Sequence, residues 1–263
     1  GFFDNYVYQS WSSFGGLSGT TATDIFQTKD GYIDIGTYEG LVKFDGVEFS
    51  TLSRSTSKDY GFVSVRSILQ DSRGDIWLGS NDEGLQKVSE NGNKLYTIEN
   101  GLPNNSVRAL CEDAKGNVWV GTASGVVYLT PDGKLINPQF GAGTTANGVI
   151  VSNLYCDSAG RVWLTTSNEN GLFLCVDGLF NPRDEFEPYT TYFATSIMQD
   201  SKGKFWIGLG DKGMSVMENG KVQILKTETI LDKIPTTAIL QDKKGNIWFG
   251  TEKGLVVYAE GKF

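Results

Sequence analysis

Histidine is absent from this chain of 263 residues. Because histidine is the most frequent general base and a leading metal ligand, its absence argues against most acid–base enzymes and against imidazole-bound metals. We therefore expect no catalytic residue, no metal site and no cofactor, and we do not expect an enzyme.

Cysteine is scarce as well. The three cysteines, Cys111, Cys156 and Cys175, are odd in number and lack the spacing of a metal site. Cys111 and Cys156 stand close before an aspartate, on segments typical of buried strands, so we interpret them as small buried hydrophobic residues. The sequence leaves a disulfide open without favouring it.

Positive charge and long apolar runs are also lacking. A net charge of −8 speaks against the basic surface that nucleic-acid binding requires. No apolar run approaches the roughly 18 residues that span a bilayer, and no secretion signal is visible. The chain begins at Gly1 and stops at Phe263 within a repeat. We therefore expect a part of a longer protein, whose membrane attachment lies in another segment.

A repeated phrase dominates what is present. Its clearest copies run from Asp71 to Gly79 and from Asp242 to Gly250, and both read Asp-x-x-Gly-x-Ile-Trp-x-Gly. The fourth-position glycine recurs every 42 to 44 residues, at Gly31, Gly74, Gly116, Gly160, Gly203 and Gly245. A fixed period of this length indicates a repeat architecture.

Each copy predicts four short strands. In the second copy, apolar segments at 63–70, 76–78, 85–88 and 95–98 are separated by turn sequences rich in Asp, Asn and Gly. Four antiparallel strands in about 43 residues make one propeller blade. Successive apolar residues, as at 76–78, fit a sheet buried on both faces between neighbouring blades. No segment has a sustained helical period.

The predicted fold class is therefore all-β, a propeller of four-stranded antiparallel blades in a single domain of residues 1–263. We predict six blades, with seven as the alternative. The six lie near 21–52, 63–98, 106–137, 149–190, 194–225 and 237–263. The sixth copy supplies only three strands, so we expect residues 5–11 to add its outer strand and close the ring.

The most regular letters of the phrase are predicted to be structural. Its aspartate and glycine suit a tight turn, and its tryptophan suits a wedge between blades. The residues assigned to these roles are Asp71, Gly74, Trp77, Asp113, Trp119, Trp163, Trp206 and Trp248. The first copy has Asp34 where tryptophan is expected, which predicts weaker packing in that blade or a polar substitute for it.

Two arginines break the pattern at the start of the innermost strand. The residue five positions before the turn aspartate is Arg66 in the second copy, Arg108 in the third, and Thr or Ser elsewhere. Two guanidinium groups from adjacent blades suit a carboxylate or a sulfate, such as that of an acidic sugar. The alternative is that each arginine pairs with a local carboxylate, such as Glu112 or Asp82, and only shapes the channel.

Connections between blades carry the remaining ligand-binding candidates. These are Arg54 and Tyr60 in 53–62, Tyr189 and Tyr192 in 181–193, and Asn105 in 101–107. Aromatic rings beside polar groups are typical of sugar-binding surfaces. Tyr189 also fits the fourth strand of blade 4. Acidic turn residues such as Asp82 fit solvated turns better than a glycosidase pair.

The phrase Asp-x-x-Gly-x-Ile/Val-Trp-x-Gly-Thr-x-x-Gly-Leu resembles the two-component regulator propeller repeat. The best copies span 113–126 and 242–255. Segments 16–18, 44–49 and 101–107 are similar to the connections between blades in that family. The resemblance covers nearly the whole chain, and the first and fourth copies depart from it at Asp34 and at Thr165–Thr166.

This resemblance implies a sensor. Such propellers form the extracytoplasmic part of membrane receptors whose output is a histidine kinase, a hybrid two-component system or a diguanylate cyclase. Members from gut bacteria commonly respond to breakdown products of polysaccharides. We therefore expect a periplasmic or extracellular signalling domain that binds a small molecule, such as an acidic oligosaccharide, beside adjoining receptor domains or a homodimer partner.

Two other hypotheses about the function stay open. A non-catalytic scaffold for protein interaction or dimerisation is the main alternative. A propeller lyase or glycoside hydrolase is less favoured, since propeller lyases generally depend on histidine, which this chain lacks.

Overall fold

A computed structural model describes residues 6–7, 9–11, 21–52, 64–141, 148–167, 171–176, 178–182, 194–210 and 213–263. The chain divides into two compact units, Gly1–Tyr96 and Thr97–Phe263, and each unit is described by itself. The prediction that residues 1–263 form a single domain stays a prediction.

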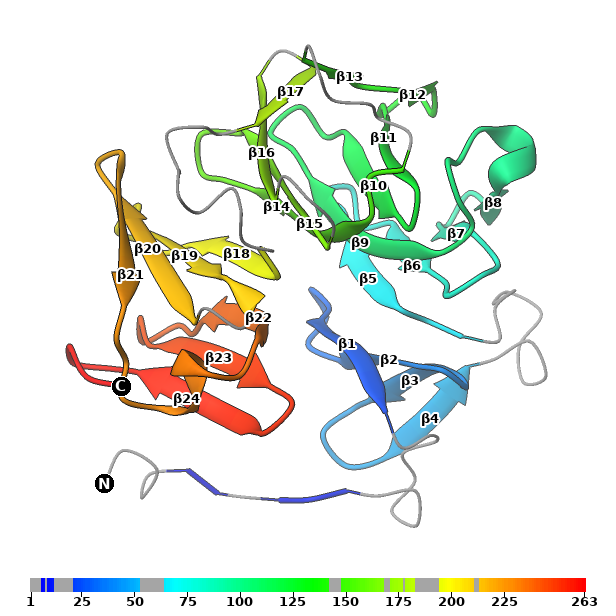
Figure 1. Ribbon diagram of the computed structural model, residues 1–263. Coiled ribbons are helices and arrows are strands. Elements are labelled where there is room, and N and C mark those ends of the chain that lie inside the picture. Colours follow the sequence, from blue (N-terminus) through cyan, green and yellow to red (C-terminus); the bar gives the residue numbers. More distant parts are fainter. Residues whose placement is uncertain are drawn as a thin grey trace. The chain divides into compact units, whose positions relative to one another are not determined.

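The first unit contains two antiparallel sheets of four strands (Figure 1). Blade 1 consists of β1 (Ala22–Gln27), β2 (Ile33–Thr37), β3 (Gly40–Phe44) and β4 (Phe49–Leu52). Blade 2 consists of β5 (Ser67–Gln70), β6 (Ile76–Gly79), β7 (Leu85–Val88) and β8 (Lys94–Tyr96). In both blades each strand pairs with the next strand in the chain.

The second unit begins with blades 3 and 4. Blade 3 consists of β9 (Val107–Glu112), β10 (Val118–Thr122), β11 (Gly125–Leu129) and β12 (Leu135–Ile136). Blade 4 consists of β14 (Val151–Cys156), β15 (Val162–Thr166), β16 (Leu172–Val176) and β17 (Leu179–Pro182). A fifth strand, β13 (Gln139–Phe140), comes from the connection between the blades and pairs in parallel with β17.

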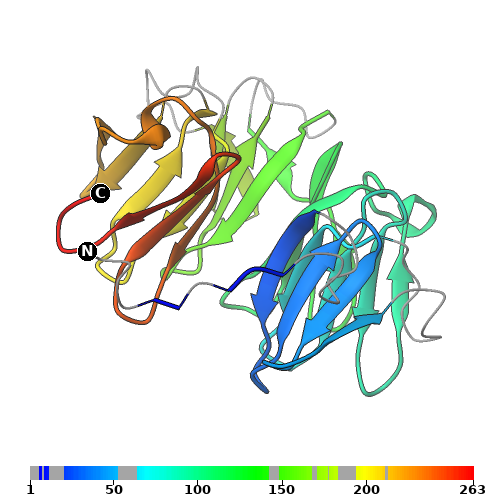
Figure 2. The ribbon, with the colours of Figure 1, turned by 90° about the horizontal axis from the view of Figure 1, so that it is seen from below.

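Blades 5 and 6 complete the second unit, and Figure 2 shows its sheets following one another in chain order. Blade 5 consists of β18 (Ser196–Gln199), β19 (Phe205–Gly208), β20 (Met214–Glu218) and β21 (Lys221–Leu225). Blade 6 consists of β22 (Thr236–Gln241), β23 (Ile247–Thr251) and β24 (Gly254–Tyr258). Short 3-10 turns, η3 (Ile98–Asn100) and η7 (Ile230–Asp232), precede blades 3 and 6.

The predicted all-β fold is confirmed: the chain is a β-propeller of six blades with almost no helix. One detail differs. Residues 6–7 and 9–11 are in no strand, and the sheet of blade 6 has three strands, so the described residues do not supply the expected outer strand. Trp11 instead lies edge-on to Phe44 and Phe49 of blade 1, with ring centroids 5.3 and 5.7 Å away.

The repeated phrase forms the turn between the first two strands of each blade. In blade 2 the amide of Gly74 donates to the carbonyl of Asp71 at 3.0 Å. Gly74 has a φ of +96°, which a residue with a Cβ adopts only under strain. In blade 3 the carbonyl of Asp113 accepts an equivalent bond from the Gly116 amide.

Tryptophans of the phrase pack between blades of the second unit. Trp119 lies edge-on to Phe180 of blade 4, Trp163 contacts Phe205 of blade 5, and Trp206 contacts Phe249 of blade 6. The ring centroids are 4.9 to 5.7 Å apart. Each of the three tryptophans therefore packs between two hydrophobic sheet faces.

Blade 1 replaces this arrangement with polar groups. Asp34 is buried in the tryptophan position, and its carboxylate lies 3.7 Å from the ammonium group of Lys43 on the adjacent strand. Thr28 stands where other blades have the turn aspartate, and its hydroxyl donates to Asp30. Tryptophan and aspartate are therefore replaced together, and the expectation of a polar substitute at Asp34 agrees with these contacts.

Among the described residues, the helical segments are too short or too polar to span a membrane.

Candidate functional site

The position five residues before the turn aspartate, at the start of each innermost strand, coincides with irregularities in the sheets. The register between the first two strands shifts around Thr23 in blade 1, Arg108 in blade 3, Ser152 in blade 4 and Thr237 in blade 6. Such β-bulges turn a side chain away from the regular alternation and are frequent beside functional sites. In these four blades the backbone at this position departs from regular strand pairing, and in two copies of the repeat the residue there is an arginine.

Several side chains at this position form hydrogen bonds between neighbouring blades or loops. The hydroxyl of Thr23 donates to the carbonyl of Val65 in blade 2, and that of Thr195 donates to the carbonyl of Thr236 in blade 6. Ser152 bonds the hydroxyl of Ser167 at 3.1 Å. These hydroxyl groups connect neighbouring blades or loops, which supports a structural role for them.

The two arginines lie in different units. Arg66 donates from Nη1 to the amide oxygen of Asn81 at 3.0 Å, a neutral side chain of its own blade. Arg108 is half-buried in the bulge of β9. That the two guanidinium groups bind one anion stays a prediction.

The other ligand-binding candidates divide into two groups. Asn105 accepts a hydrogen bond from the Ile98 amide at 2.9 Å and so helps to order the connection before blade 3. The remaining four, Arg54, Tyr60, Tyr189 and Tyr192, lie outside the described residues.

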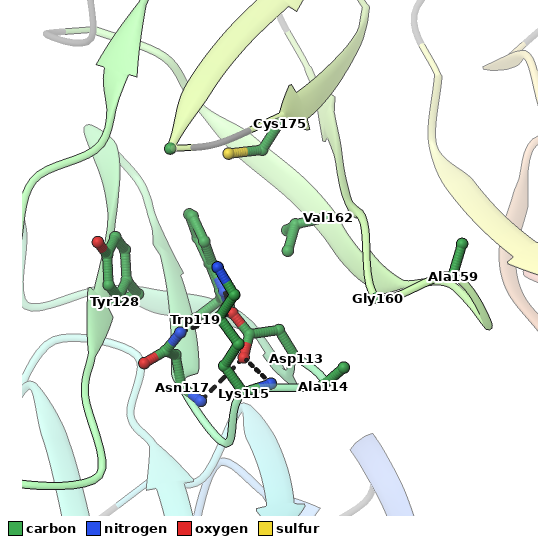
Figure 3. A pocket seen from close by; sticks show the side chains of 11 residues that line it. Asp113, Ala114, Lys115, Asn117, Trp119, Tyr128, Ala159, Gly160, Val162 and Cys175 are labelled. Carbon is green, nitrogen blue, oxygen red and sulfur yellow. Dashed lines mark hydrogen bonds between the residues drawn. The ribbon is translucent and has the colours of Figure 1, made fainter.

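A cavity of about 390 Å³ lies between blades 3 and 4 (Figure 3). It is at the end of the blades that carries the Asp-x-x-Gly turns, and Arg108 is at the opposite end of β9. Trp119 and Tyr128 form one side of the cavity, and Val162 and Gly160 face them from blade 4. Its volume falls within the range of small-molecule pockets, roughly 300–1,000 Å³.

The cavity lies where a glutamine side chain that bridges other blade pairs is missing. In three other blade pairs, a glutamine just before the turn accepts a hydrogen bond from a backbone amide of the preceding turn. The pairs are Gln70 with Lys29, Gln199 with Ser158, and Gln241 with Ser201, at 2.7 to 3.0 Å. Blade 4 has Cys156 at the glutamine position.

The residues of the two turns that border the cavity are small too. The amide that a glutamine would reach is that of Ala114, which lines the cavity with Ala159 and Gly160. A Cβ added at Gly160 would lie only 2.9 Å from the Cβ of Ala114, so the two turns already touch. The missing glutamine side chain therefore leaves space beside these turns, and the described residues place no hydrogen-bond acceptor on the Ala114 amide.

The cavity combines an aromatic wall with an exposed cationic side chain. The rings of Trp119 and Tyr128 lie on adjacent strands with centroids 4.5 Å apart. Asp113 accepts hydrogen bonds from Trp119, Asn117 and two backbone amides, so its carboxylate is occupied by its own turn. Lys115 is exposed at the rim. This arrangement suits a molecule with an apolar ring face and a negative group.

Sequence reasoning placed candidates at the opposite end of the blades and missed this cavity. Its signal was nevertheless present, since a glutamine precedes the turn in the first, second, fifth and sixth copies and Cys156 replaces it in the fourth. Within the described residues, no three His, Cys, Asp or Glu side chains gather to hold a metal ion.

Comparison with known families identifies the repeat. The two component regulator propeller model matches residues 59–82, 101–124 and 231–253, which confirms the resemblance seen in the sequence. No protein with a curated description matches the chain in sequence.

Solved structures share the fold at low identity. The extracellular domain of the hybrid two component system BT3049 from B. thetaiotaomicron is 19% identical, with a TM-score of 0.60 over 97% of this chain and 40% of its own length. The extracellular domain of the one component system BT4673 from the same organism is 22% identical, with a TM-score of 0.64 over 92% and 39%. This chain thus spans about two fifths of each.

An enzyme has the same fold. A catalytically inactive virginiamycin B lyase from Staphylococcus aureus, with a histidine changed to alanine and solved with quinupristin, is 16% identical. Its TM-score is 0.72 over 91% of this chain and 81% of its own length. At these identities the likeness shows the propeller fold alone.

Proposed function

We propose that this chain, a six-bladed propeller with two component regulator propeller repeats, is the ligand-sensing domain of a bacterial membrane receptor outside the cytoplasm. The observation that carries the proposal is the match of that family model to three separate blades, 2, 3 and 6. The fold shared with extracellular domains of two signalling systems supports the same location. Adjoining receptor domains or a homodimer partner would transmit the signal.

The cavity between blades 3 and 4 is the proposed ligand site. Its aromatic wall, Trp119 and Tyr128, offers a surface for the C–H face of a sugar ring. The ammonium group of Lys115 would pair with a carboxylate or sulfate, and the Ala114 amide would donate to a hydroxyl group. The ligand class is therefore a carbohydrate-like molecule, with acidic oligosaccharides preferred over neutral ones.

Thermal unfolding with a sugar panel tests this proposal. Oligosaccharides that contain uronic acid are compared with neutral oligosaccharides of equal length. A ligand at one hundred times its Kd stabilises the folded protein by about 2.7 kcal/mol. We expect the acidic sugars to raise the melting temperature more, and Lys115→Gln to reduce that shift.

Lys202→Gln is the matched control, because Lys202 occupies the same turn position in blade 5 and is equally exposed. Equal loss of the shift in both variants would mean non-specific charge attraction. A shift that depends on Arg66→Ala with Arg108→Ala, and not on Lys115→Gln, would move the site to the arginines. No shift with any sugar would contradict small-molecule sensing and favour an interaction scaffold.

A lyase is the second candidate, because a virginiamycin B lyase shares the fold. The loss of activity that its name attributes to a single histidine replacement argues against the same chemistry in a chain without histidine. Incubation of the purified chain with quinupristin, followed by chromatography and tandem mass spectrometry, is expected to leave the compound intact, and a cleaved product would overturn this view.

A further inference from the structure

Two cysteines face each other across the interface of blades 3 and 4. Cys111 is the penultimate residue of β9 and Cys156 the last residue of β14, and these innermost strands are neighbours. Both side chains pack against one hydrophobic cluster, which includes Trp119 and Val162. The two thiols are thus neighbours in space although they are 45 positions apart in the chain.

Blades 3 and 4 pack closely on both sides of this pair. A Cβ added at Gly160 would lie 2.9 Å from Ala114 Cβ, just beyond the cysteines in the two turns. A Cβ added at Gly121, which pairs with Ala109 of β9, would lie 3.2 Å from Leu154 Cδ1 of β14. Residues of blades 3 and 4 are therefore closely packed on both sides of Cys111 and Cys156.

The third cysteine is placed differently. Cys156 and Cys175 both pair with Val162, from the two strands that flank β15. Strands are about 4.8 Å apart, so the Cα atoms of Cys156 and Cys175 are separated by two such spacings, roughly 9.6 Å. A disulfide needs a Cα separation of about 4.4–6.8 Å, so these two residues do not pair.

We propose that Cys111 and Cys156 form a disulfide that links blade 3 to blade 4 in an oxidising environment. Each thiol loses one proton and one electron, and the two sulfur atoms form the new bond. The oxidant is a second disulfide, which accepts the two electrons and two protons and leaves as two thiols. The bond takes the place of the glutamine bridge that joins other blade pairs.

The environment of the pair affects when the bond forms. Burial raises the pKa of the Cys111 thiol well above its ordinary value, and the neighbouring Cys156 raises it further. Because the thiolate is the reactive form, oxidation of the folded, reduced protein is slow near pH 7. We therefore expect the disulfide to form during folding, before the strands close over the thiols.

Refolding of the denatured, reduced chain with oxidised and reduced glutathione tests this proposal. Alkylation under denaturing conditions and mass spectrometry should find one alkylated cysteine, Cys175, and one peptide pair linked through Cys111 and Cys156. Refolding with excess reductant should give three alkylated cysteines. The oxidised protein should melt roughly 5–10 °C higher than the reduced protein.

Cys175→Ser is the matched control and should keep both the linked peptide pair and the rise in melting temperature. Cys111→Ser and Cys156→Ser should each abolish both while refolding to the same far-UV circular dichroism spectrum. Three alkylated cysteines after oxidative refolding, or a linked pair that contains Cys175, would overturn the proposal. Sugar binding is not needed for any of these readouts, so the result is independent of the proposed function.

Discussion

Trp77 Nε1 donates a hydrogen bond of 2.9 Å to Asp71 Oδ2, and both side chains are buried in blade 2. Asp71 Oδ1 accepts from the backbone amides of Arg73 and Asp75, at 3.0 Å each. One carboxylate thus holds the turn and the wedge together. The same bond, at 2.8–2.9 Å, occurs in Trp119–Asp113, Trp163–Asp157, Trp206–Asp200 and Trp248–Asp242.

Replacement of this carboxylate should be costly. Asp71→Ala leaves the Trp77 Nε1–H and two turn amides without their acceptor, so we expect a loss of about 3 kcal/mol in the free energy of unfolding. Urea denaturation measures it. Trp77→Phe combined with Asp71→Ala should cost less than the sum of the single changes, because both remove one bond. Asp82→Ala, an exposed turn residue of the same blade, should change stability by less than about 0.5 kcal/mol.

The repeat makes most of this fold predictable. Each copy of the phrase encodes a turn locally, and every copy but the first also supplies the tryptophan wedge, so the six copies predict six blades without any long-range information. The role of residues 5–11 could not be read in the same way. Their strand pairing depends on contacts outside any copy, and Trp11 packs against Phe44 and Phe49 instead.

The candidate site was harder to predict, because the cavity arises where Cys156 replaces a longer glutamine side chain and leaves space unfilled. Arg66 and Arg108 attract notice as charged residues at a Ser/Thr position, whereas Cys156 at a glutamine position is inconspicuous. Its consequence is visible only once Gln199 and Gln241 are seen to bridge neighbouring blades. The bulge at Arg108 is likewise a property of strand register, which composition does not encode.

Blades 3 and 4 approach so closely at Gly121 that a larger residue does not fit unless its neighbours move. A Cβ at this position would overlap Val151, which is fully buried. We expect Gly121→Ala to lower the free energy of unfolding by about 1–3 kcal/mol. Adding Val151→Ala should recover part of this loss, although Val151→Ala alone is destabilising.

The sequence supports this expectation, since blade 4 has Thr165 in the Gly121 position and blade 5 has the smaller Ala194 in the Val151 position. A double-mutant cycle by urea denaturation measures the coupling between positions 121 and 151. Simple additivity of the two changes would show that the overlap is relieved by movement of the whole strand.

Asp24 should give the protein an unusual dependence of stability on pH. Burial raises the pKa of this carboxyl to about 6, although the amides of Ile68 and Ile25 donate to it. Its folded pKa is above the unfolded value, so the native state binds the extra proton and the stabilisation is lost as pH rises from about 4 to 6. The associated change is on the order of 3 kcal/mol.

Denaturation of Asp24→Asn between pH 4 and 7 checks this sign. The variant should lose less stability than the parent protein as pH rises through that window.

Asp242 should have the opposite effect on the pH dependence of stability. Burial opposes its ionisation, but hydrogen bonds from Trp248, Asn246 and two backbone amides outweigh burial and lower its pKa to about 2. Its contribution is present above pH 4 and is lost as pH falls toward 2, so Asp242→Asn should be less stable than the parent protein above pH 4, and this difference should shrink only as pH falls through that lower window.

Restoring the glutamine should close the cavity between blades 3 and 4. In Cys156→Gln, the new side chain is expected to accept a hydrogen bond from the Ala114 amide, as Gln199 does from Ser158. It would occupy the space next to Trp119 and Tyr128, so the rise in melting temperature caused by uronic-acid oligosaccharides should disappear. Cys156→Ser also lacks the disulfide but leaves the space open, and it should keep that rise. If both variants respond to the sugars equally, the ligand binds elsewhere on the propeller.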